Sequence, residues 1–167
     1  MRRVSTGGQL LLLALLSLLP TASLPAEAAG DKVYAFEDQQ IRIEAAVASV
    51  SARGDFDLQI SMNPRSGWKI LADNSSGSKP LRLKFSPGKC LKLKGKSSMP
   101  APDLAGTDES GAYSEYYTKE TVFRQEFGRL PCGQKKGAEG VASISYLLCQ
   151  DKRCVGPFSR EMRFKAP

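Results

Sequence analysis

The sequence predicts an all-β protein that folds as a β-sandwich, and three observations support this. Apolar and polar residues alternate with a period of two over several short segments, which is the pattern of strands with one buried face. Clusters of Gly, Pro, Asn, Asp and Ser separate these segments. No segment after residue 28 has sustained helical periodicity. Many short strands punctuated by turns are typical of a sandwich of two sheets.

The alternating segments give the expected strands and the segments between them give the expected turns. Strands are predicted at residues 41–47, 55–61, 81–86, 121–127, 141–149 and 158–164. Turns are predicted at residues 63–67, 73–77 and 86–88. Residues 97–111 are rich in Pro, Ser, Gly and Asp, so we expect a long loop packed over a sheet. Residues 133–140 are expected to form a charged, hairpin-type loop.

The first 28 residues have the layout of a secretory signal peptide. A basic start at Arg2 and Arg3 precedes an apolar run over residues 10–19, and Ala26-Glu27-Ala28 is a cleavage signal. The apolar run is about half of the ~20 residues that a membrane-spanning helix needs. We therefore expect residues 29–167 to be exported to the periplasm as one soluble domain without stable membrane insertion. An uncleaved anchor is the alternative.

Charge and histidine content exclude several classes of function. The formal net charge is +7, but Phe85 is the one aromatic residue among the lysines of residues 79–96, whereas a base-stacking surface requires several interleaved aromatics. We therefore expect a solvated basic face and no nucleic-acid partner. The chain has no histidine, which excludes Ser-His-Asp and Cys-His catalysis and most catalytic zinc sites. The remaining chemistry belongs to cysteines, carboxylates, lysines and tyrosines.

The four cysteines of an exported chain suggest two disulfides, for which three connectivities are possible. Four residues separate Cys149 from Cys154, so a hairpin would bring their thiols within disulfide distance. On the chain-entropy model this short loop stabilises by ~2 kcal/mol, whereas a Cys90–Cys132 loop stabilises by ~4 kcal/mol. Cys90–Cys132 is therefore the better structural staple, and Cys149–Cys154 the better labile pair. Two inert disulfides are the alternative, and zinc on four cysteines is disfavoured because only one close pair exists.

The residues around the close pair favour thiol chemistry. Lys152 and Arg153 place positive charge beside the sulfurs, which favours the reactive thiolate. Apolar residues precede Cys149, so we expect it to be buried and Cys154 to be the more exposed sulfur. Asp151 has two possible roles, capping the turn or exchanging a proton with the thiols.

The run from Tyr146 to Pro157, YLLCQDKRCVGP, resembles the redox motif of the DsbD N-terminal (alpha) domain family. That motif is a tyrosine, two residues, cysteine, any residue, aspartate, a short gap, cysteine and then proline. The segment 66–69, Ser-Gly-Trp-Lys, is similar to the family's Gly-Trp-Lys segment, and residues 80–83 and 99–102 fit the order of its parts. Residues 113–123 resemble the segment that holds its cap loop. The resemblance covers roughly residues 35–165.

This resemblance implies an immunoglobulin-like β-sandwich that passes reducing equivalents in the periplasm without a cofactor. Cys154 would join a partner in a mixed disulfide and Cys149 would resolve it, with Tyr116 as the cap aromatic. Tyr146, Asp151 and Pro157 would surround the pair, although packing is the favoured role for Tyr146 and for Trp68. The Cys90–Cys132 bridge lies outside the family motif and would be structural.

The resemblance also implies the partners. The membrane and thioredoxin-like domains of full DsbD are not in this sequence, so the expected partners are thioredoxin-like periplasmic proteins and a separate membrane electron donor. A second hypothesis comes from another class of function. It is a non-catalytic envelope β-sandwich that binds a partner and holds two structural disulfides.

Overall fold

The computed structural model describes residues 30–51, 53–74, 81–107, 112–134 and 138–167. The predicted signal peptide therefore lies outside the described residues, as do parts of the predicted turns at 73–77 and 133–140. Within the described part, the chain consists of β-strands and one short 3-10 helix, η1 (Pro131–Gln134). The predicted all-β class is confirmed.

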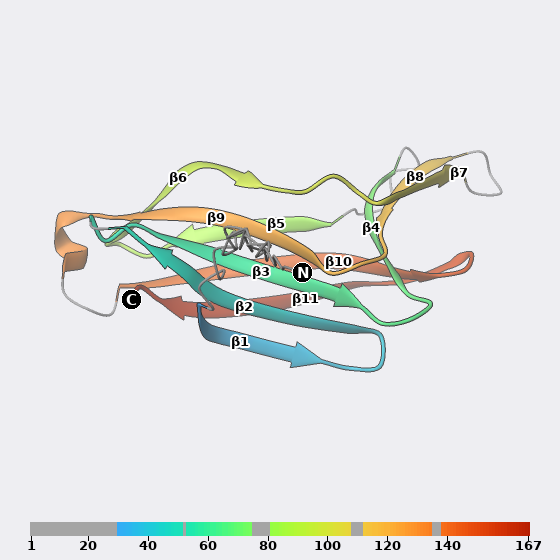
Figure 1. Ribbon diagram of the computed structural model, residues 1–167, viewed down its shortest axis with the longest axis horizontal. Coiled ribbons are helices and arrows are strands. Elements are labelled where there is room, and N and C mark those ends of the chain that lie inside the picture. Colours follow the sequence, from blue (N-terminus) through green and yellow to red (C-terminus); the bar gives the residue numbers. More distant parts are fainter. Residues whose placement is uncertain (1–29, 52, 75–80, 108–111, 135–137) are drawn as a thin grey trace, which may run out of the picture.

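The strands form two antiparallel sheets that pack face to face as an immunoglobulin-like β-sandwich (Figure 1). The first sheet contains, in spatial order, β1 (Asp31–Glu37), β2 (Ile41–Val50), β3 (Phe56–Pro64), β9 (Thr121–Arg129) and β6 (Leu91–Ser98). The second sheet contains, in spatial order, β11 (Arg153–Lys165), β10 (Glu139–Gln150), β4 (Lys69–Asn74), β8 (Tyr113–Tyr117) and β7 (Leu104–Thr107). A further strand, β5 (Arg82–Pro87), pairs with β10 along the same edge as β4.

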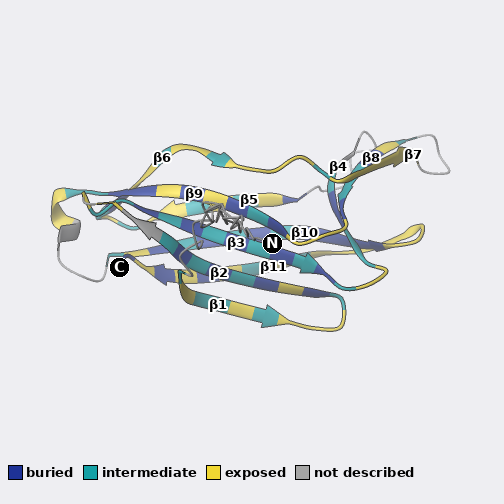
Figure 2. Ribbon diagram, viewed as in Figure 1, coloured by how far each residue is buried: buried dark blue, intermediate teal, exposed yellow. Residues whose placement is uncertain are grey.

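The core forms where the inward-facing residues of the two sheets meet. Buried residues alternate along β3 and β10, so that one face of each strand is apolar and packed (Figure 2). Phe127 is fully buried at the centre, with ring centroids of Phe56, Phe85 and Phe164 within 5.3, 6.1 and 5.0 Å. Replacing such a ring with alanine costs about 3–5 kcal/mol. These ring contacts join the first sheet, which carries Phe56 and Phe127, to the second sheet, which carries Phe85 and Phe164.

The disulfide between Cys90 and Cys132 ties the start of β6 to η1. Their Cα atoms are 5.3 Å apart, and the Leu130 backbone N–H donates to the Cys90 carbonyl at 3.0 Å. The bridge closes a sequence separation of 42 residues. This is the pairing that the loop lengths favour, and its position beside the β6–β9 ladder suits a structural staple.

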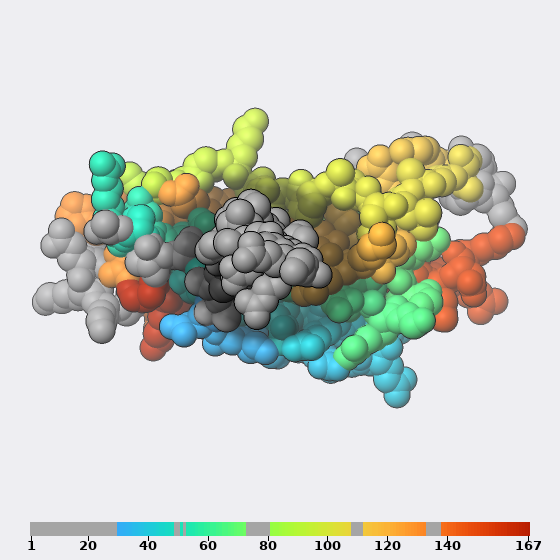
Figure 3. Space-filling view, in the orientation of Figure 1, coloured from blue at the N-terminus to red at the C-terminus, as the bar shows by residue number. Residues whose placement is uncertain are grey.

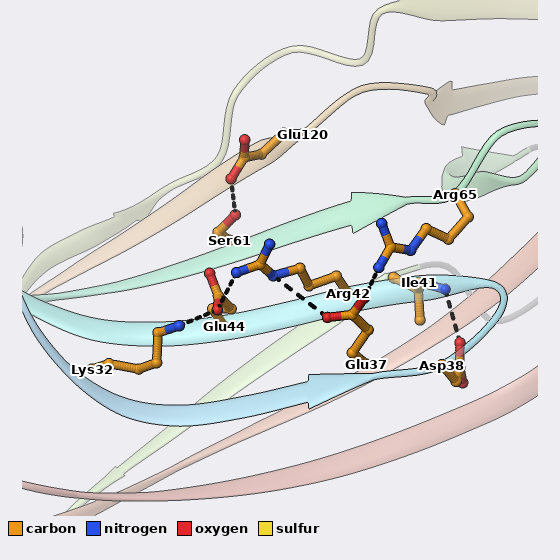
Figure 4. Close-up of polar contacts among 9 residues, drawn as sticks. All are labelled: Lys32, Glu37, Asp38, Ile41, Arg42, Glu44, Ser61, Arg65 and Glu120. Carbon is orange, nitrogen blue, oxygen red and sulfur yellow. Dashed lines mark hydrogen bonds and ion pairs between the residues drawn. The ribbon is translucent and has the colours of Figure 1, made fainter.

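The outer face of the first sheet is covered by paired charges (Figure 4). Glu44 accepts from both Lys32 and Arg42, and Arg65 pairs with Glu37. These bonds hold the pKa of Glu44 below its ordinary value, first through Lys32 and then through Arg42. Each of these three cations is therefore paired with a carboxylate within the chain.

Six predicted strand segments are confirmed as β2, β3, β5, β9, β10 and β11. Five strands were not predicted: β1, β4, β6, β7 and β8. The expected loop at 97–111 was wrong at 104–107, which form β7, and at its first two residues, which belong to β6. β1, β6 and β7 are edge strands, whose exposure removes the alternating apolar pattern. In β4 the consecutive residues Ile70 and Leu71 are both buried, one on each face of the sheet, so no alternation appears there either.

Candidate functional site

The second cysteine pair lies at the tip of the long β10–β11 hairpin. Cys149 and Cys154 are directly opposite each other, are joined by a disulfide, and have Cα atoms 3.9 Å apart. Two residues, Asp151 and Lys152, make the turn between the strands. Asp151 has φ of 51°, a left-handed conformation that aspartate tolerates better than most residues. The tip protrudes at one end of the molecule (Figure 3).

A bulge in β11 places Cys154 on the same face as Cys149. Three residues of β10, from Tyr146 to Leu148, lie opposite four residues of β11, from Phe158 to Val155. Because side chains alternate between faces, this extra residue moves Cys154 to the face opposite the sandwich core. Gly156 makes the bulge possible, since its φ is +116° and a Cβ there would lie 2.9 Å from the Phe158 backbone nitrogen.

The two sulfurs have different surroundings. Cys149 is fully buried in a small cluster with Leu71 and Leu147, on the face of the second sheet turned away from the first sheet; we call this the outer face. Cys154 is exposed. The expected contrast in burial is therefore present, and exchange chemistry can begin only at the exposed sulfur.

Tyr116 packs against the cluster that contains Cys149. It lies on β8, directly opposite Leu71 of β4 and Leu104 of β7. Its neighbour Tyr117 faces the opposite way, into the sandwich core. The structure thus brings the predicted cap aromatic to the buried sulfur's cluster, while its guarding role stays a prediction.

Lys69 completes the site from the other edge of β10. It is paired directly with Cys149, and its Nζ lies 4.1 Å from the centroid of the Tyr116 ring. A cation over an aromatic face contributes roughly 0.5–1 kcal/mol at an exposed site. The Gly-Trp-Lys segment is therefore adjacent to the cysteine motif. Its lysine adds a positive charge that sequence reasoning did not assign to the site, because that assignment needs the pairing of β4 with β10.

Hydrogen bonds at Asp103 connect the two ends of the β7–β8 hairpin, which carries Tyr116. The Asp103 carboxylate accepts hydrogen bonds from the Thr118 hydroxyl at 2.7 Å, the Thr118 N–H at 2.9 Å and the Lys119 N–H at 3.2 Å. Its own N–H donates to the Tyr116 carbonyl at 3.1 Å. Burial raises the pKa of Asp103, but these donors outweigh it and the pKa lies below its ordinary value.

The other predicted site residues are placed as follows. Tyr146 is buried in the sandwich core on the opposite face of β10 from Cys149, with its ring 5.6 Å from that of Phe158. Burial raises the pKa of Tyr146 to about 12, so it is not available as an acid or base near neutral pH. Asp151 and Pro157 are exposed, at the turn and at the bulge respectively. The structure therefore brings together Cys149, Cys154 and Tyr116, and leaves Tyr146 apart.

The arrangement can support thiol–disulfide exchange without a metal. Lys152 and Arg153 are exposed beside the sulfurs and Lys69 lies on the far side of Cys149, and such charges favour a thiolate over a thiol. Among the described residues, no group of three or more Cys, Asp or Glu side chains could hold a metal ion. In that same part of the chain, no helix is long and apolar enough to cross a membrane.

Comparison with known proteins adds likeness of fold only. No protein-family model matches the chain, and no curated protein sequence matches it. Among solved structures, the reduced DsbD N-terminal domain of Neisseria meningitidis superposes with a TM-score of 0.46 at 14% identity, covering 71% of this chain and 86% of that one. The GAE domain of yeast GGA1 superposes with the same TM-score of 0.46 at 11% identity, covering 82% of this chain and 98% of that one. At this level of similarity neither structure carries an argument about activity.

Proposed function

We propose that this chain is a periplasmic thiol–disulfide exchange module that passes reducing equivalents through Cys149 and Cys154. The observation that carries the proposal is the pairing of a fully buried sulfur with an exposed one at a protruding hairpin tip. Lys69, Lys152 and Arg153 lie near the pair and Tyr116 packs against the cluster of Cys149. Positive charge beside a partly exposed sulfur favours the reactive thiolate.

Exposure alone does not separate this pair from the other disulfide, since Cys132 is also exposed. The two disulfides differ instead in the length of the loop that they close and in the residues beside their sulfurs. A sequence separation of 42 residues makes Cys90–Cys132 the larger contributor to stability on the chain-entropy model, against a separation of 5 for Cys149–Cys154. In the hairpin pair the buried sulfur belongs to a cluster that Tyr116 packs against, and the Lys69 ammonium lies over the Tyr116 ring.

The exchange proceeds in two displacements. In the reduced module the Cys154 thiolate attacks one sulfur of a partner's disulfide, and the other partner sulfur leaves as a thiolate that takes up a proton. Cys149 then loses its proton and attacks the Cys154 sulfur, which breaks the mixed disulfide and releases the second partner thiol. Two electrons and two protons pass to the partner, and the module ends oxidised. Its partners are thioredoxin-like periplasmic proteins, and a membrane electron donor restores the dithiol by the reverse sequence.

A redox-buffer titration of the folded protein tests this proposal. We equilibrate the protein with dithiothreitol or glutathione buffers of increasing reducing power, trap thiols with an alkylating agent and count them by mass. The proposal predicts that Cys149–Cys154 is reduced while circular dichroism still reports the native fold. The Cys149→Ser, Cys154→Ser double variant is the matched control and should release no thiols in this range. If both disulfides resist until the protein unfolds, the chain is a binding module with two structural bridges.

A further inference from the structure

The outer face of the second sheet has a pocket of about 380 Å³ beside β5, β10 and β11. Two cations and three hydroxyls line it together with one apolar residue: Arg82, Lys84, Ser143, Ser145, Ser159 and Ile144. Ser145 lies directly opposite Arg82 of β5 on one side and opposite Ser159 of β11 on the other. Directly opposed residues point to the same face. The cations and hydroxyls therefore converge on the face that carries Cys149.

The charges of this pocket are not neutralised within the described chain. No ion pair or hydrogen bond joins the side chain of Arg82 or Lys84 to another described residue. An acidic residue on this face, Glu161, is opposite Ser143 and pairs with Arg163 at 3.1 Å. Beside β1–β3, by contrast, Lys32, Arg42 and Arg65 are each paired with a carboxylate (Figure 4). An arginine fork flanked by a lysine and hydroxyl donors matches a carboxylate or another anionic oxygen group.

The pocket lies a defined distance from the sulfurs. Ser145 and Cys149 are four residues apart on one strand and share a face, which places them about 13 Å apart at ~3.3 Å per residue. An extended peptide rises by the same amount per residue. A carboxylate four residues from a peptide cysteine would therefore reach Arg82 while that cysteine meets the disulfide.

We propose that this pocket binds an acidic side chain of the polypeptide partner, placed about four residues from the partner's reacting cysteine. The occupant is an extended acidic segment lying along β10. This inference rests on the proposed function, because that function brings a cysteine-containing polypeptide to this face. Charge complementarity selects the acidic residue, and the strand rise sets its spacing.

Two measurements test the pocket. The first is redox-independent. Fluorescence anisotropy measures how oxidised protein binds a labelled extended peptide with serine in place of cysteine and glutamate four residues away. We expect Arg82→Gln with Lys84→Gln to weaken binding about tenfold, as should replacing the peptide glutamate with glutamine. The matched control, Lys92→Gln with Lys96→Gln on β6, removes the same charge from the first sheet and should leave the affinity within about twofold.

The second measurement is the rate of exchange with a mixed-disulfide peptide that keeps its cysteine. The glutamate peptide should react about tenfold faster than the glutamine peptide with the wild-type protein. The two peptides should react equally with the Arg82, Lys84 double variant. Reaction with dithiothreitol should be the same for all variants.

The outcomes separate the two proposals. Equal binding of the glutamate and glutamine peptides, or equal weakening by the control variant, overturns the pocket even if exchange with dithiothreitol is fast. Glutamate-dependent binding by a protein that exchanges with no disulfide supports the pocket and overturns the proposed function. Competition by inorganic phosphate as strong as that of the glutamate peptide would show a site for anions in general, which contradicts a site built for a polypeptide.

Discussion

Removing the Tyr116 side chain should open the buried sulfur to reagents. Tyr116 is partly buried against the cluster of Leu71, Leu147 and Cys149, and its ring carries the Lys69 ammonium. Loss of roughly 100 Å² of apolar contact at about 25 cal/mol per Å² costs ~2.5 kcal/mol of local stability. Relaxation of neighbouring side chains reduces this, so we use about 2 kcal/mol. That change raises the population of the open cluster by about 30-fold.

The assay uses the Cys154→Ser background, in which Cys149 is the free thiol and Cys90–Cys132 stays bridged. We expect Tyr116→Ala to raise the alkylation rate of Cys149 by iodoacetamide by about 30-fold, because the reagent reaches this sulfur only when the cluster opens. Tyr113→Ala is the matched control, since Tyr113 is an exposed tyrosine on the same strand and outside the cluster. An unchanged rate in Tyr116→Ala, or an equal acceleration in Tyr113→Ala, would refute the capping role.

Four further predictions concern Gly156, Lys69, the Cys90–Cys132 disulfide and Asp103. Gly156→Ala should lower the free energy of unfolding by about 2–3 kcal/mol in urea melts, because φ of +116° and the nearby backbone exclude a Cβ; a cost below about 0.5 kcal/mol would contradict this. Lys69→Met should slow alkylation of the reduced pair by about threefold, since a charge ~7 Å away contributes about 0.6 kcal/mol in water, and Lys69→Arg should restore the rate. Cys90→Ala with Cys132→Ala should cost about 4 kcal/mol, against about 2 kcal/mol for the hairpin pair, and equal costs would remove the structural distinction. Asp103→Asn should cost about 1 kcal/mol at neutral pH and remove an acid-sensitive step. The hydrogen bonds that depress the Asp103 pKa contribute stability above its unfolded value of about 3.9, and this is lost as pH falls through the lower folded value. Hydrogen exchange of β8 amides from pH 5 to pH 2 reads this step, and identical profiles for wild type and variant would contradict it.

Alternating apolar residues predicted the parts of the fold that bury one face. β3 has strict alternation and a buried face, so the strand was predicted, although it continues to Pro64, three residues beyond the predicted end and into the predicted turn at 63–67. β6 and β7 lie at or near sheet edges, where exposure removes the pattern that sequence reasoning needs. The Pro, Ser and Gly content of residues 97–111 predicted a loop, but the segment contains the end of β6 and all of β7, because these residues also occur in short exposed edge strands.

The candidate site was predictable where chemistry is local in sequence. The hairpin spacing of Cys149 and Cys154 and the exposure of Cys154 follow from residues within one turn. The contribution of Lys69 depends on which strand pairs with β10, and no local pattern contains that information. Tyr146 shows the converse, since its closeness in sequence to Cys149 does not place it on the same face.

The most direct test of the account is to trap the mixed disulfide with single-cysteine variants of the hairpin pair. The protein is reduced, incubated with oxidised thioredoxin-like partner or with envelope extract, quenched with acid and resolved without reductant. The account predicts that Cys149→Ala accumulates a covalent complex joined through Cys154, because the resolving sulfur is absent. Cys154→Ala should accumulate little, because Cys149 is fully buried. A reversed pattern, or equal trapping by both variants, would contradict the assignment of the exposed Cys154 as the attacking sulfur.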